Sequence, residues 1–461
     1  MMRGAFDRAA DSLAVVRRSC DANDAVHITV VQPGETKPKT LSTFHPQFTY
    51  PIFGDEERIF GYKGLIIRLR FAAHDLRPHI HISYDDRFKA VGDTAAREDY
   101  LSNSWKSEAF INLPEYENAV QDDPSAKEFK PPGMLVHSYE VDDRKYEIWA
   151  GSLADPEKVT PPTPTASAYS IVGYATAYRY WLYQRDRSET PTVKSDPFPG
   201  PEAKISELPA RLRIAQFLVL PPHHRSGHGT HLYTTIHATC LADPTIVELT
   251  VEDPNEQFDA LRDTADYCLL RPEFLKQGVN INPDPYEAYS RKQRLKVVPT
   301  AALIPTKLLL DIRTSFKIES TQFAHILEMY LLSQIPSRHR LSGGANLARL
   351  LIKKHKIDDV NDRRYYWWRM LIKQRLFKKH RSLLSELDAT DRVEKLDETV
   401  RNVEEGYEVT LQALEGRLPD VQDEPPVVAS ESRNGRVKRK LTISDDEDEE
   451  NGTELAKRPK V

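Results

Sequence analysis

The stretch RIAQFLVLPPHHRSGHGT, residues 213–230, decides how the fold of this chain is interpreted. Residues 214–220 are mostly apolar and predict a strand, which runs into a turn that contains Gly227 and Gly229. A helix is predicted next, because apolar residues recur at helical spacing after the turn. Glycines let a backbone approach a ligand, and the free N–H groups at a helix start attract a diphosphate. The stretch therefore indicates a strand–loop–helix site for a nucleotide or coenzyme A.

The spacing within this loop excludes two common phosphate-binding motifs. The loop has no Gly-Lys-Ser/Thr ending, and it lacks the third glycine of a dinucleotide fingerprint. Several histidines gather here and make a zinc site conceivable, but no carboxylate stands at a metalloprotease spacing, so we expect no metal. These histidines are His223, His224, His228, His231 and His237.

A carboxylate follows the next predicted strand, which spans residues 246–251. Glu252 ends this strand, and Asp253 with Pro254 predicts a helix start in which Asp253 is the N-cap. A carboxylate beside such a loop can accept the proton of an attacking amine. Glu252 is therefore our candidate general base, and the alternative is that it only helps to cap the helix.

The rest of the chain predicts a mixed α/β (α+β) protein. Strands are expected at 65–71, 79–84 and 169–183, and the pattern turns helical after about residue 303. One helix is predicted to bury Phe323, Ile326, Leu327, Tyr330 and Leu331, and another, or a short antiparallel pair, is predicted over 393–407. The expected domains are 1–156 (α/β), 157–285 (mixed sheet with the loop), 286–415 (helical) and 416–461 (a disordered charged tail).

Residues 363–379, RRYYWWRMLIKQRLFKK, combine aromatic and basic side chains. Such a mixture can bind nucleic acid. However, Trp367, Met370, Leu371 and Phe377 share one helical face, which favours packing in a core with the basic residues outside. We therefore expect no direct binding of nucleic acid, and a docking face for another subunit or a histone is an intermediate option.

Composition narrows the class of protein further. The chain has 461 residues, of which 39% are hydrophobic and 29% charged, with a formal net charge of −5. Only three cysteines occur, which fits a reducing compartment, and no apolar run is long enough to span a membrane. The tail carries basic clusters at 436–440 and 457–460 and an acidic block at 444–450. It is either a solvated tail or one that directs nuclear import and attracts histones.

Residues 224–229 resemble motif A of the GNAT acetyltransferase superfamily, with His224 as a departure at its first position. Residues 214–270, and TVEDP at 250–254 in particular, are similar to the catalytic core of the type B histone acetyltransferases. FHPQFTY (44–50), FGDEERIFGYKGL (53–65) and FKPPGMLVHSY (129–139) resemble the N-terminal domain of that family. EMYLLSQIP (328–336) resembles its fungal members. The resemblance covers most of the chain up to about residue 414.

This resemblance implies a function and roles for particular residues. It implies transfer of an acetyl group from acetyl-CoA to a lysine of newly made, non-nucleosomal histone H-four, with Glu252 as the base, before chromatin assembly and in DNA repair. Acetyl-CoA would be bound by Phe217, Leu218, Val219, His224, Arg225, Ser226, Gly227, His228, Gly229, Thr230 and Asn255. The histone tail would be bound by Asp55, Glu56, Glu57, Tyr178, Arg179 and Tyr180. Without the resemblance, the acidic residues would be interpreted as a solvated turn and the tyrosines as sheet packing.

The resemblance also implies a WD-repeat histone chaperone as partner, and a location in both cytoplasm and nucleus. One departure stands out. Members of the family usually carry a further helix and strand between segments like 149–156 and 161–167, including a Phe-Ile-Glu whose glutamate lies near the substrate lysine. Residues 155–160 lead here straight into prolines, so the chain is either a shortened variant or the product of a gene prediction that lost an exon. Glu157 is a poor substitute for that glutamate, because a proline-rich loop does not hold it.

Three functions compete. The first is an active lysine acetyltransferase for free histones. The second is a shortened, catalytically weak histone-binding subunit of the same family. The third is a GNAT enzyme for a small amine, against which the large N-terminal region and the acidic turn argue.

Overall fold

The computed structural model describes residues 19–34, 36–87, 109–122, 130–152, 169–182, 208–285, 298–341 and 359–415. The described residues all lie in one compact unit, which spans residues 1–416. Helices and mixed sheets make up this unit, which confirms the mixed α/β class. The junction at 153–168, with Glu157, and the charged tail at 416–461 lie outside the described residues. The domain boundaries therefore remain predictions.

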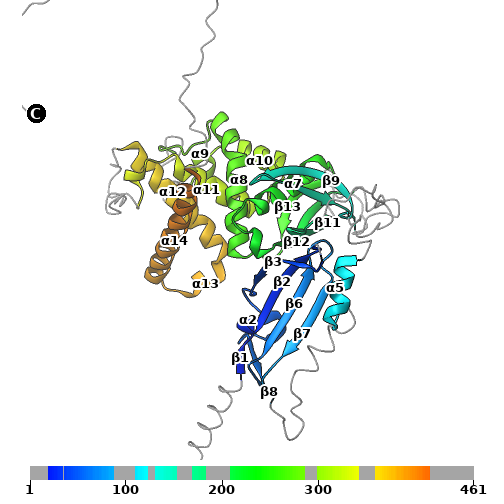
Figure 1. Ribbon diagram of the computed structural model, residues 1–461. Coiled ribbons are helices and arrows are strands. Elements are labelled where there is room, and N and C mark those ends of the chain that lie inside the picture. The colour runs from blue at the N-terminus through cyan, green and yellow to red at the C-terminus, as the bar shows by residue number, and fades with distance from the viewer. Residues whose placement is uncertain are drawn as a thin grey trace, which may run out of the picture. The chain divides into compact units, whose positions relative to one another are not determined.

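The N-terminal region is built on a four-stranded sheet in the order β3-β2-β6-β7, in which only β2 and β6 are parallel. Its strands are β2 (Val26–Gln32), β3 (Lys39–Phe44), β6 (Ile66–Ala72) and β7 (Pro78–Ser83). The last two confirm the strands predicted at 65–71 and 79–84. Helix α5 (Leu113–Asp122) packs Tyr116 and Val120 onto this sheet (Figure 1).

Short elements surround this sheet and hold its ends. They are β1 (Ser19–Asp21), α2 (Ala22–Ala25), α3 (Tyr50–Phe53), β4 (Arg58–Phe60), β5 (Tyr62–Lys63) and β8 (Asp86–Arg87). Their apolar residues Ala22, Ala25, Ile59 and Tyr62 form a core with Ile67 of β6. The turn between α3 and β4 therefore projects from a packed base.

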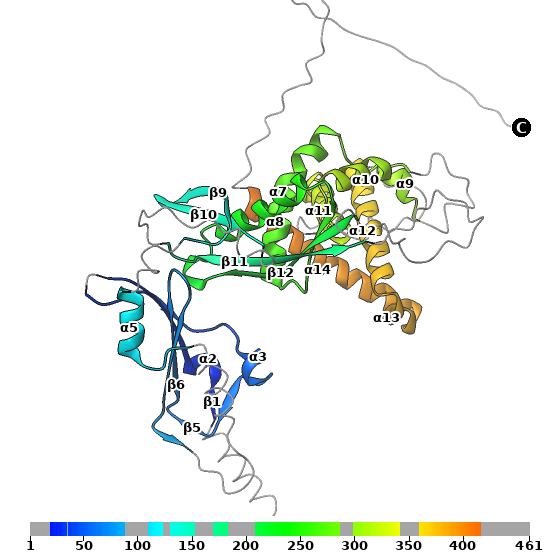
Figure 2. The same ribbon diagram turned by 90° about the vertical axis from the view of Figure 1, so that its right-hand side faces the viewer.

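The central region contains a three-stranded sheet in the order β11-β12-β13. Its strands are β11 (Gly173–Trp181), β12 (Ala210–Val219) and β13 (Ile246–Val251). Strand β11 begins later than predicted, and β12 begins earlier. Helices α7 (His228–Ala242) and α8 (Glu256–Lys276) cover the sheet, and Ile214, Tyr233, Cys240, Leu249 and Phe258 share one core. A separate hairpin comprises β9 (Met134–Val141) and β10 (Arg144–Ala150) (Figure 2).

The outer edge of β13 is joined to the C-terminal helices. The N–H of Leu249 donates to the carbonyl of Lys317 at 2.8 Å, and Leu249 forms a parallel bridge with Ile318. The Lys317 ammonium in turn donates to the carbonyls of Cys240, Leu241 and Asp243 at the end of α7, at 2.7–3.2 Å. The segment between α10 (Thr306–Ser315) and α11 (Ser320–Ser333) therefore extends the central sheet beyond β13.

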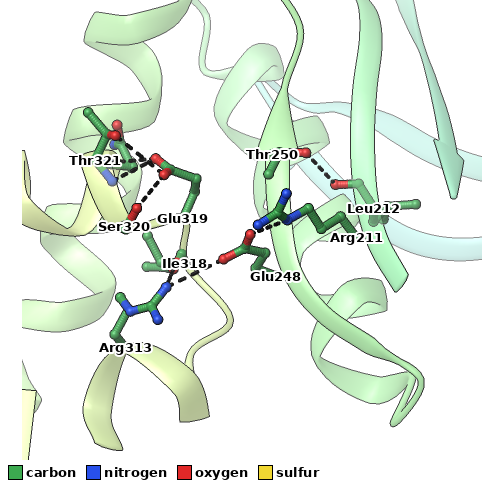
Figure 3. A network of polar contacts seen from close by, with 10 residues as sticks. Arg211, Leu212, Glu248, Thr250, Arg313, Ile318, Glu319, Ser320 and Thr321 are labelled. Atoms are coloured by element: carbon green, nitrogen blue, oxygen red, sulfur yellow. Dashed lines mark hydrogen bonds and ion pairs between the residues drawn. The ribbon is translucent and has the colours of Figure 1, made fainter. Parts of the chain in front are cut away.

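An ion-pair network strengthens this junction (Figure 3). Glu248 of β13 accepts hydrogen bonds from Arg211 of β12 and, at 3.4 Å, from Arg313 of α10. The Glu248 side chain is 12% exposed. Because a nearly buried carboxylate is costly without partners, the two arginines compensate its desolvation and tie α10 to the sheet.

The helical region comprises α9 (Thr300–Leu303), α10 (Thr306–Ser315), α11 (Ser320–Ser333), α12 (Val360–Lys379), α13 (Arg381–Glu386) and α14 (Ala389–Glu415). Helix α11 buries all five apolar residues that its periodicity predicted. Helix α14 is one continuous helix, so the alternative of an antiparallel pair is wrong. Its buried stripe begins at Val400, and Val393 remains exposed. None of the helices that the structure describes is long and apolar enough to cross a membrane.

Helix α12 confirms packing for the aromatic segment but corrects which face is buried. Tyr365, Trp368, Ile372 and Leu376 are the buried residues, along with Trp367, whereas Met370, Leu371 and Phe377 are only partly buried. The expectation that the basic residues lie outside is wrong for Arg369, which is 5% exposed. Its guanidinium pairs with Asp397 and Glu404 of α14, so its charge is balanced within the core.

Candidate active site

Strands β12 and β13 part at the site. They pair in parallel from Ala210 to Ile214 of β12, and the N–H of Glu252 makes the last bond, to the carbonyl of Ile214 at 2.9 Å. Strand β12 continues to Val219 with β11 on its other side. Within the described residues, no strand pairs with residues 215–219 on the side that β13 leaves. The parting therefore opens a backbone edge next to Glu252.

A β-bulge in β12 determines which backbone N–H groups face this open edge. The register between β11 and β12 shifts so that Ala215 is the extra residue. Beyond it, the N–H of Leu220 donates to Val172 on the β11 side, at 2.8 Å. Alternate residues of a strand point their backbone groups to opposite edges, so the N–H groups of Phe217 and Val219 face the open side. Bulges of this kind commonly re-aim a strand beside an active site.

The two glycines of the loop differ in their conformation. Gly227 is the N-cap of α7 and is left-handed, with φ of 84°. The helix begins at His228, so Gly229, which was predicted to lie in the turn, belongs to the first turn of the helix instead. A Cβ on Gly229 would lie 2.6 Å from Cδ1 of Leu261, so this position fits a glycine closely. No side chain caps the first turn of α7, and its N–H groups are available to an anion. Thr230 is exposed on this turn.

The residues between strand and helix are half-buried or exposed. His224 folds back so that its Nε2 lies 2.8 Å from the carbonyl oxygen of Val219. Arg225 is exposed and has a positive φ of 63°. The Ser226 hydroxyl lies 3.5 Å from the carbonyl of His224. The predicted cofactor-binding residues at 217–219 and 224–230 are thus contiguous along the strand end, the turn and the helix start.

The histidines around the loop have partners other than a metal. His228 is 3% exposed, and its Nδ1 lies 2.9 Å from the Tyr139 hydroxyl. The ring of His231 stacks on that of Tyr139, and Nε2 of His237 lies 2.8 Å from the carbonyl of Phe316. Burial lowers the pKa of His228, His231 and His237, so these rings are neutral at physiological pH.

Glu252 stands exposed at the end of β13. The Tyr178 hydroxyl donates to its Oε2 at 3.4 Å, and Arg213 donates to that hydroxyl at 3.4 Å. The hydrogen bond from Arg213 to Tyr178, followed by the charges of Glu252 and Asp253, raises the pKa of Arg213. A charged arginine, a tyrosine and a carboxylate therefore share one face of the sheet.

The residues after Glu252 correct one prediction. Asp253 is not the N-cap of α8, since its φ is 39° and the helix begins only at Glu256. Asn255 is the N-cap, and its side chain accepts a hydrogen bond from the N–H of Phe258 at 2.8 Å. The turn between strand and helix is two residues longer than predicted, because the Asn255 cap prevails over the Asp-Pro pattern.

The predicted histone-binding residues of β11 fall on two faces. Tyr178 and Tyr180 lie on the face of Glu252 and are 41% and 53% exposed. Arg179 points to the other face, where it pairs with Asp243 and donates to the Thr245 hydroxyl at 3.0 Å. Strand alternation separates them, so only the tyrosines share the face of the carboxylate.

The acidic turn also divides. Asp55 and Glu56 are exposed, whereas Glu57 holds local structure by accepting from the N–H groups of Thr49 and Tyr50 and from the Asn23 amide. The Thr49 hydrogen bond is the main cause that lowers the pKa of Glu57. Of the three acidic residues, only Glu57 takes part in the hydrogen bonds named here, and the carboxylates of Asp55 and Glu56 do not.

Sequence reasoning missed two residues and the bulge. Arg213 could have been found from strand pairing, since it aligns with both Tyr178 and Thr250. Tyr139 could not, because it lies 89 positions from His228. No local pattern announces the extra residue Ala215.

The site has three parts that suit an enzyme which transfers an acyl group from a thioester to an amine. They are an uncapped helix start for a diphosphate, an open strand edge for an extended thioester arm, and a carboxylate that can accept a proton from the amine. The comparisons agree. Residues 18–160 match the family model described as "Histone acetyl transferase HAT1 N-terminus".

Three relatives, each named "Histone acetyltransferase type B catalytic subunit", are similar over most of the chain. The protein of Aspergillus oryzae is 60% identical over 96% of this chain and 99% of its own. The protein of Aspergillus fumigatus is 59% identical over 96% and 88%, and that of Neurospora crassa 32% identical over 95% and 97%. The chain therefore belongs to the type B histone acetyltransferase catalytic subunits. This membership confirms the predicted enzyme class, and acetyl-CoA is the co-substrate that this class implies.

Proposed function

We propose that this chain transfers the acetyl group of acetyl-CoA to a lysine side chain of newly synthesised, non-nucleosomal histone H-four, through a GNAT-type site with Glu252 as general base. One observation carries the proposal. Strand β12 separates from β13 after Ile214, whose carbonyl accepts a hydrogen bond from the N–H of Glu252. The edge of β12 that is unpaired beyond this point leads to the uncapped start of α7.

The geometry fits the co-substrate along its length. The N–H groups at the start of α7, after Gly227 and beside Gly229, suit its diphosphate. Arg225 is exposed beside them as an additional cation. The N–H groups of Phe217 and Val219 suit the amide-containing arm, which would lie along the edge as an added strand. We also assign Leu218 of β12 and Asn255, the N-cap of α8, to the binding of this arm.

The thioester of acetyl-CoA supplies an acyl carbon with a good leaving group. The substrate ammonium is protonated near neutral pH, with an ordinary pKa of about 10.4, and must lose a proton before it attacks. The Glu252 carboxylate accepts that proton, directly or through one water. The Val219 N–H faces the open edge and would donate to the carbonyl oxygen as negative charge develops on it. Tyr178 and Arg213 hold Glu252 in place.

Histone recognition is proposed for exposed groups of β11 and of the acidic turn. Tyr178 and Tyr180 offer apolar walls to a lysine stem, and Asp55 and Glu56 offer carboxylates to a basic tail. Glu57 and Arg179, which were predicted to bind as well, instead hold their own turn and strand, and we assign them a supporting role.

The variant Glu252→Gln tests the base. Since glutamine accepts no proton, we expect kcat to fall at least about 100-fold, while the affinity for CoA changes by less than about twofold. Acetyl transfer to a histone-tail peptide and calorimetric titration with CoA measure the two. Asp253→Asn is the matched control and should retain most activity. Full activity in Glu252→Gln would refute the assignment.

A second function, that of a catalytically weak histone-binding subunit, is favoured by one comparison. The alignment with the Aspergillus oryzae protein runs over 504 positions although this chain has 461 residues, so the relative carries residues without a counterpart here. A shortened segment between 149 and 167 would account for them. Acetylation of a tail peptide by the purified chain, well above a no-enzyme blank, would exclude this alternative. Sequencing the transcript across that segment would decide whether the gap is natural.

We further propose that the enzyme acts with a WD-repeat histone chaperone, in cytoplasm and nucleus, ahead of chromatin assembly and in DNA repair. The family resemblance supports these roles. Affinity purification of the full chain from cells, with fractionation, tests them, and the absence of any WD-repeat protein would speak against the partner.

A further inference from the structure

The hairpin of β9 and β10 contacts the start of α7 through a group of rings. The Tyr139 hydroxyl lies 2.9 Å from Nδ1 of His228, the first residue of the helix. The rings of Tyr139 and His231 are stacked, with centroids 3.9 Å apart and an angle of 12°. Tyr146 packs on His228 at 4.4 Å. The hairpin therefore packs against the first turn of α7.

Contacts of this kind between rings fix the position of a helix end. His228 and His231 are one turn apart and present the same face to the hairpin. His228 is 3% exposed, and burial is the main cause that lowers its pKa. A neutral ring offers one nitrogen as acceptor, which suits a hydrogen bond from the Tyr139 hydroxyl. A two-stranded hairpin is marginal by itself, so hairpin and helix stabilise each other.

The hairpin contacts lie on the turn of α7 whose free N–H groups can bind an anion. The free N–H groups of α7 belong to residues 228–230, and the hairpin holds His228 within that turn. Strong anion binding needs these donors to be preorganised, because ordering them on binding costs affinity. Residues of β9 and β10 lie far from the loop in sequence, so this support is separate from the glycines of the turn.

We propose that the β9–β10 hairpin is part of the acetyl-CoA site, with Tyr139 as a positioning residue that holds the diphosphate-binding turn of α7 through His228. This inference rests on the proposed function and extends the site to an element that carries none of the predicted cofactor-binding residues. The hairpin contributes no contact to the reacting atoms. It sets affinity for the half of the co-substrate that carries the diphosphate.

Tyr139→Phe is the decisive variant, since it removes the hydroxyl and keeps the stacked ring. Losing one hydrogen bond should weaken CoA binding about threefold to tenfold in calorimetry. The KM for acetyl-CoA should rise by the same factor, with kcat and the KM for the histone peptide unchanged. Tyr169→Phe is the matched control, because its hydroxyl donates to Glu147 of the hairpin at 3.2 Å and not to α7, and it should bind CoA within about twofold of the unsubstituted chain.

A second probe separates positioning from general damage. S-acetyl-pantetheine lacks the diphosphate, so Tyr139→Phe should use it as well as the unsubstituted chain does. Unchanged CoA affinity in Tyr139→Phe would overturn the inference, as would an equal loss with both acetyl donors. If Gly227→Ala weakens CoA binding while Tyr139→Phe does not, the site stands and the role of the hairpin falls. If the unsubstituted chain takes up no CoA, the proposed function fails as well.

Discussion

Single residues decide whether the α7 turn forms, and Gly227 is the clearest case. It has φ of 84°, and a Cβ added there would meet nothing within 4 Å, so its restriction is one of backbone and not of packing. Gly229 is the reverse, since a Cβ there would meet Leu261. The sequence predicted that both glycines matter. It could not show that they matter for different reasons, because the reason lies in the neighbours of each.

Gly227→Ala should destabilise the protein by about 1 kcal/mol, because an L-residue with a side chain disfavours the left-handed region. The control is Gly406→Ala in the exposed middle of α14, where nothing lies within 4 Å of the added Cβ. Alanine there should stabilise by up to about 1 kcal/mol. Urea unfolding of both variants measures the two changes. Shifts of the same sign would contradict this account.

At the scale of elements, buried ion pairs hold the C-terminal helices together. Glu328 of α11 accepts hydrogen bonds from Arg375 of α12 at 2.7 and 2.8 Å and from the Tyr407 hydroxyl of α14 at 2.9 Å. Burial raises the pKa of Glu328, and Arg375 offsets part of that effect. One carboxylate therefore joins three helices.

Removing one partner of this pair should cost more than removing both. Glu328→Leu leaves the Arg375 charge uncompensated and should destabilise by about 3–5 kcal/mol. The double variant Glu328→Leu with Arg375→Met should recover most of that loss, because no unpaired charge remains. Chemical unfolding of the single and double variants gives both values. A double variant less stable than the single one would show that the pair itself provides the stability.

The helices show how far the sequence predicts such elements. Periodicity predicted the buried face of α11 correctly, because apolar residues alone form it. It failed for α12, where Arg369 is buried and Met370 is only partly so. Apolar periodicity cannot foresee a buried arginine whose partners, Asp397 and Glu404, lie on a helix about thirty residues further on. The same limit applies to Tyr139, whose partner is distant, whereas the position of Glu252 at the end of β13 could be predicted because its strand and loop are local.

At the scale of the whole molecule, two buried groups change the stability in opposite directions as the pH falls. Burial lowers the pKa of His325 to about 4, with Arg375 as a further cause, while burial raises the pKa of Asp266 to about 7. The folded state thus resists protonation at His325 and resists deprotonation at Asp266. Acidification from pH 6.5 to 4 destabilises through the histidine and stabilises through the aspartate.

Differences between variants separate the two effects. The free energy of unfolding of the unsubstituted chain, minus that of His325→Gln, should be flat above about pH 7 and fall as the pH drops from 6.5 toward 4. The free energy of unfolding of the unsubstituted chain, minus that of Asp266→Asn, should rise as the pH drops from 7 toward 4. Denaturant unfolding at four pH values provides both curves. Parallel curves, or a histidine difference that grows in acid, would contradict the assigned directions.

The bond between Leu249 and Lys317 has a consequence for how this enzyme can be divided. A fragment that stopped near residue 285 would keep the glycine turn and Glu252, yet it would present the bare edge of β13 to solvent. Exposed edge strands recruit strands from other molecules, so such a fragment would self-associate instead of remaining monomeric. A chimera that exchanges the helical part must therefore also supply a replacement for Lys317 and Ile318.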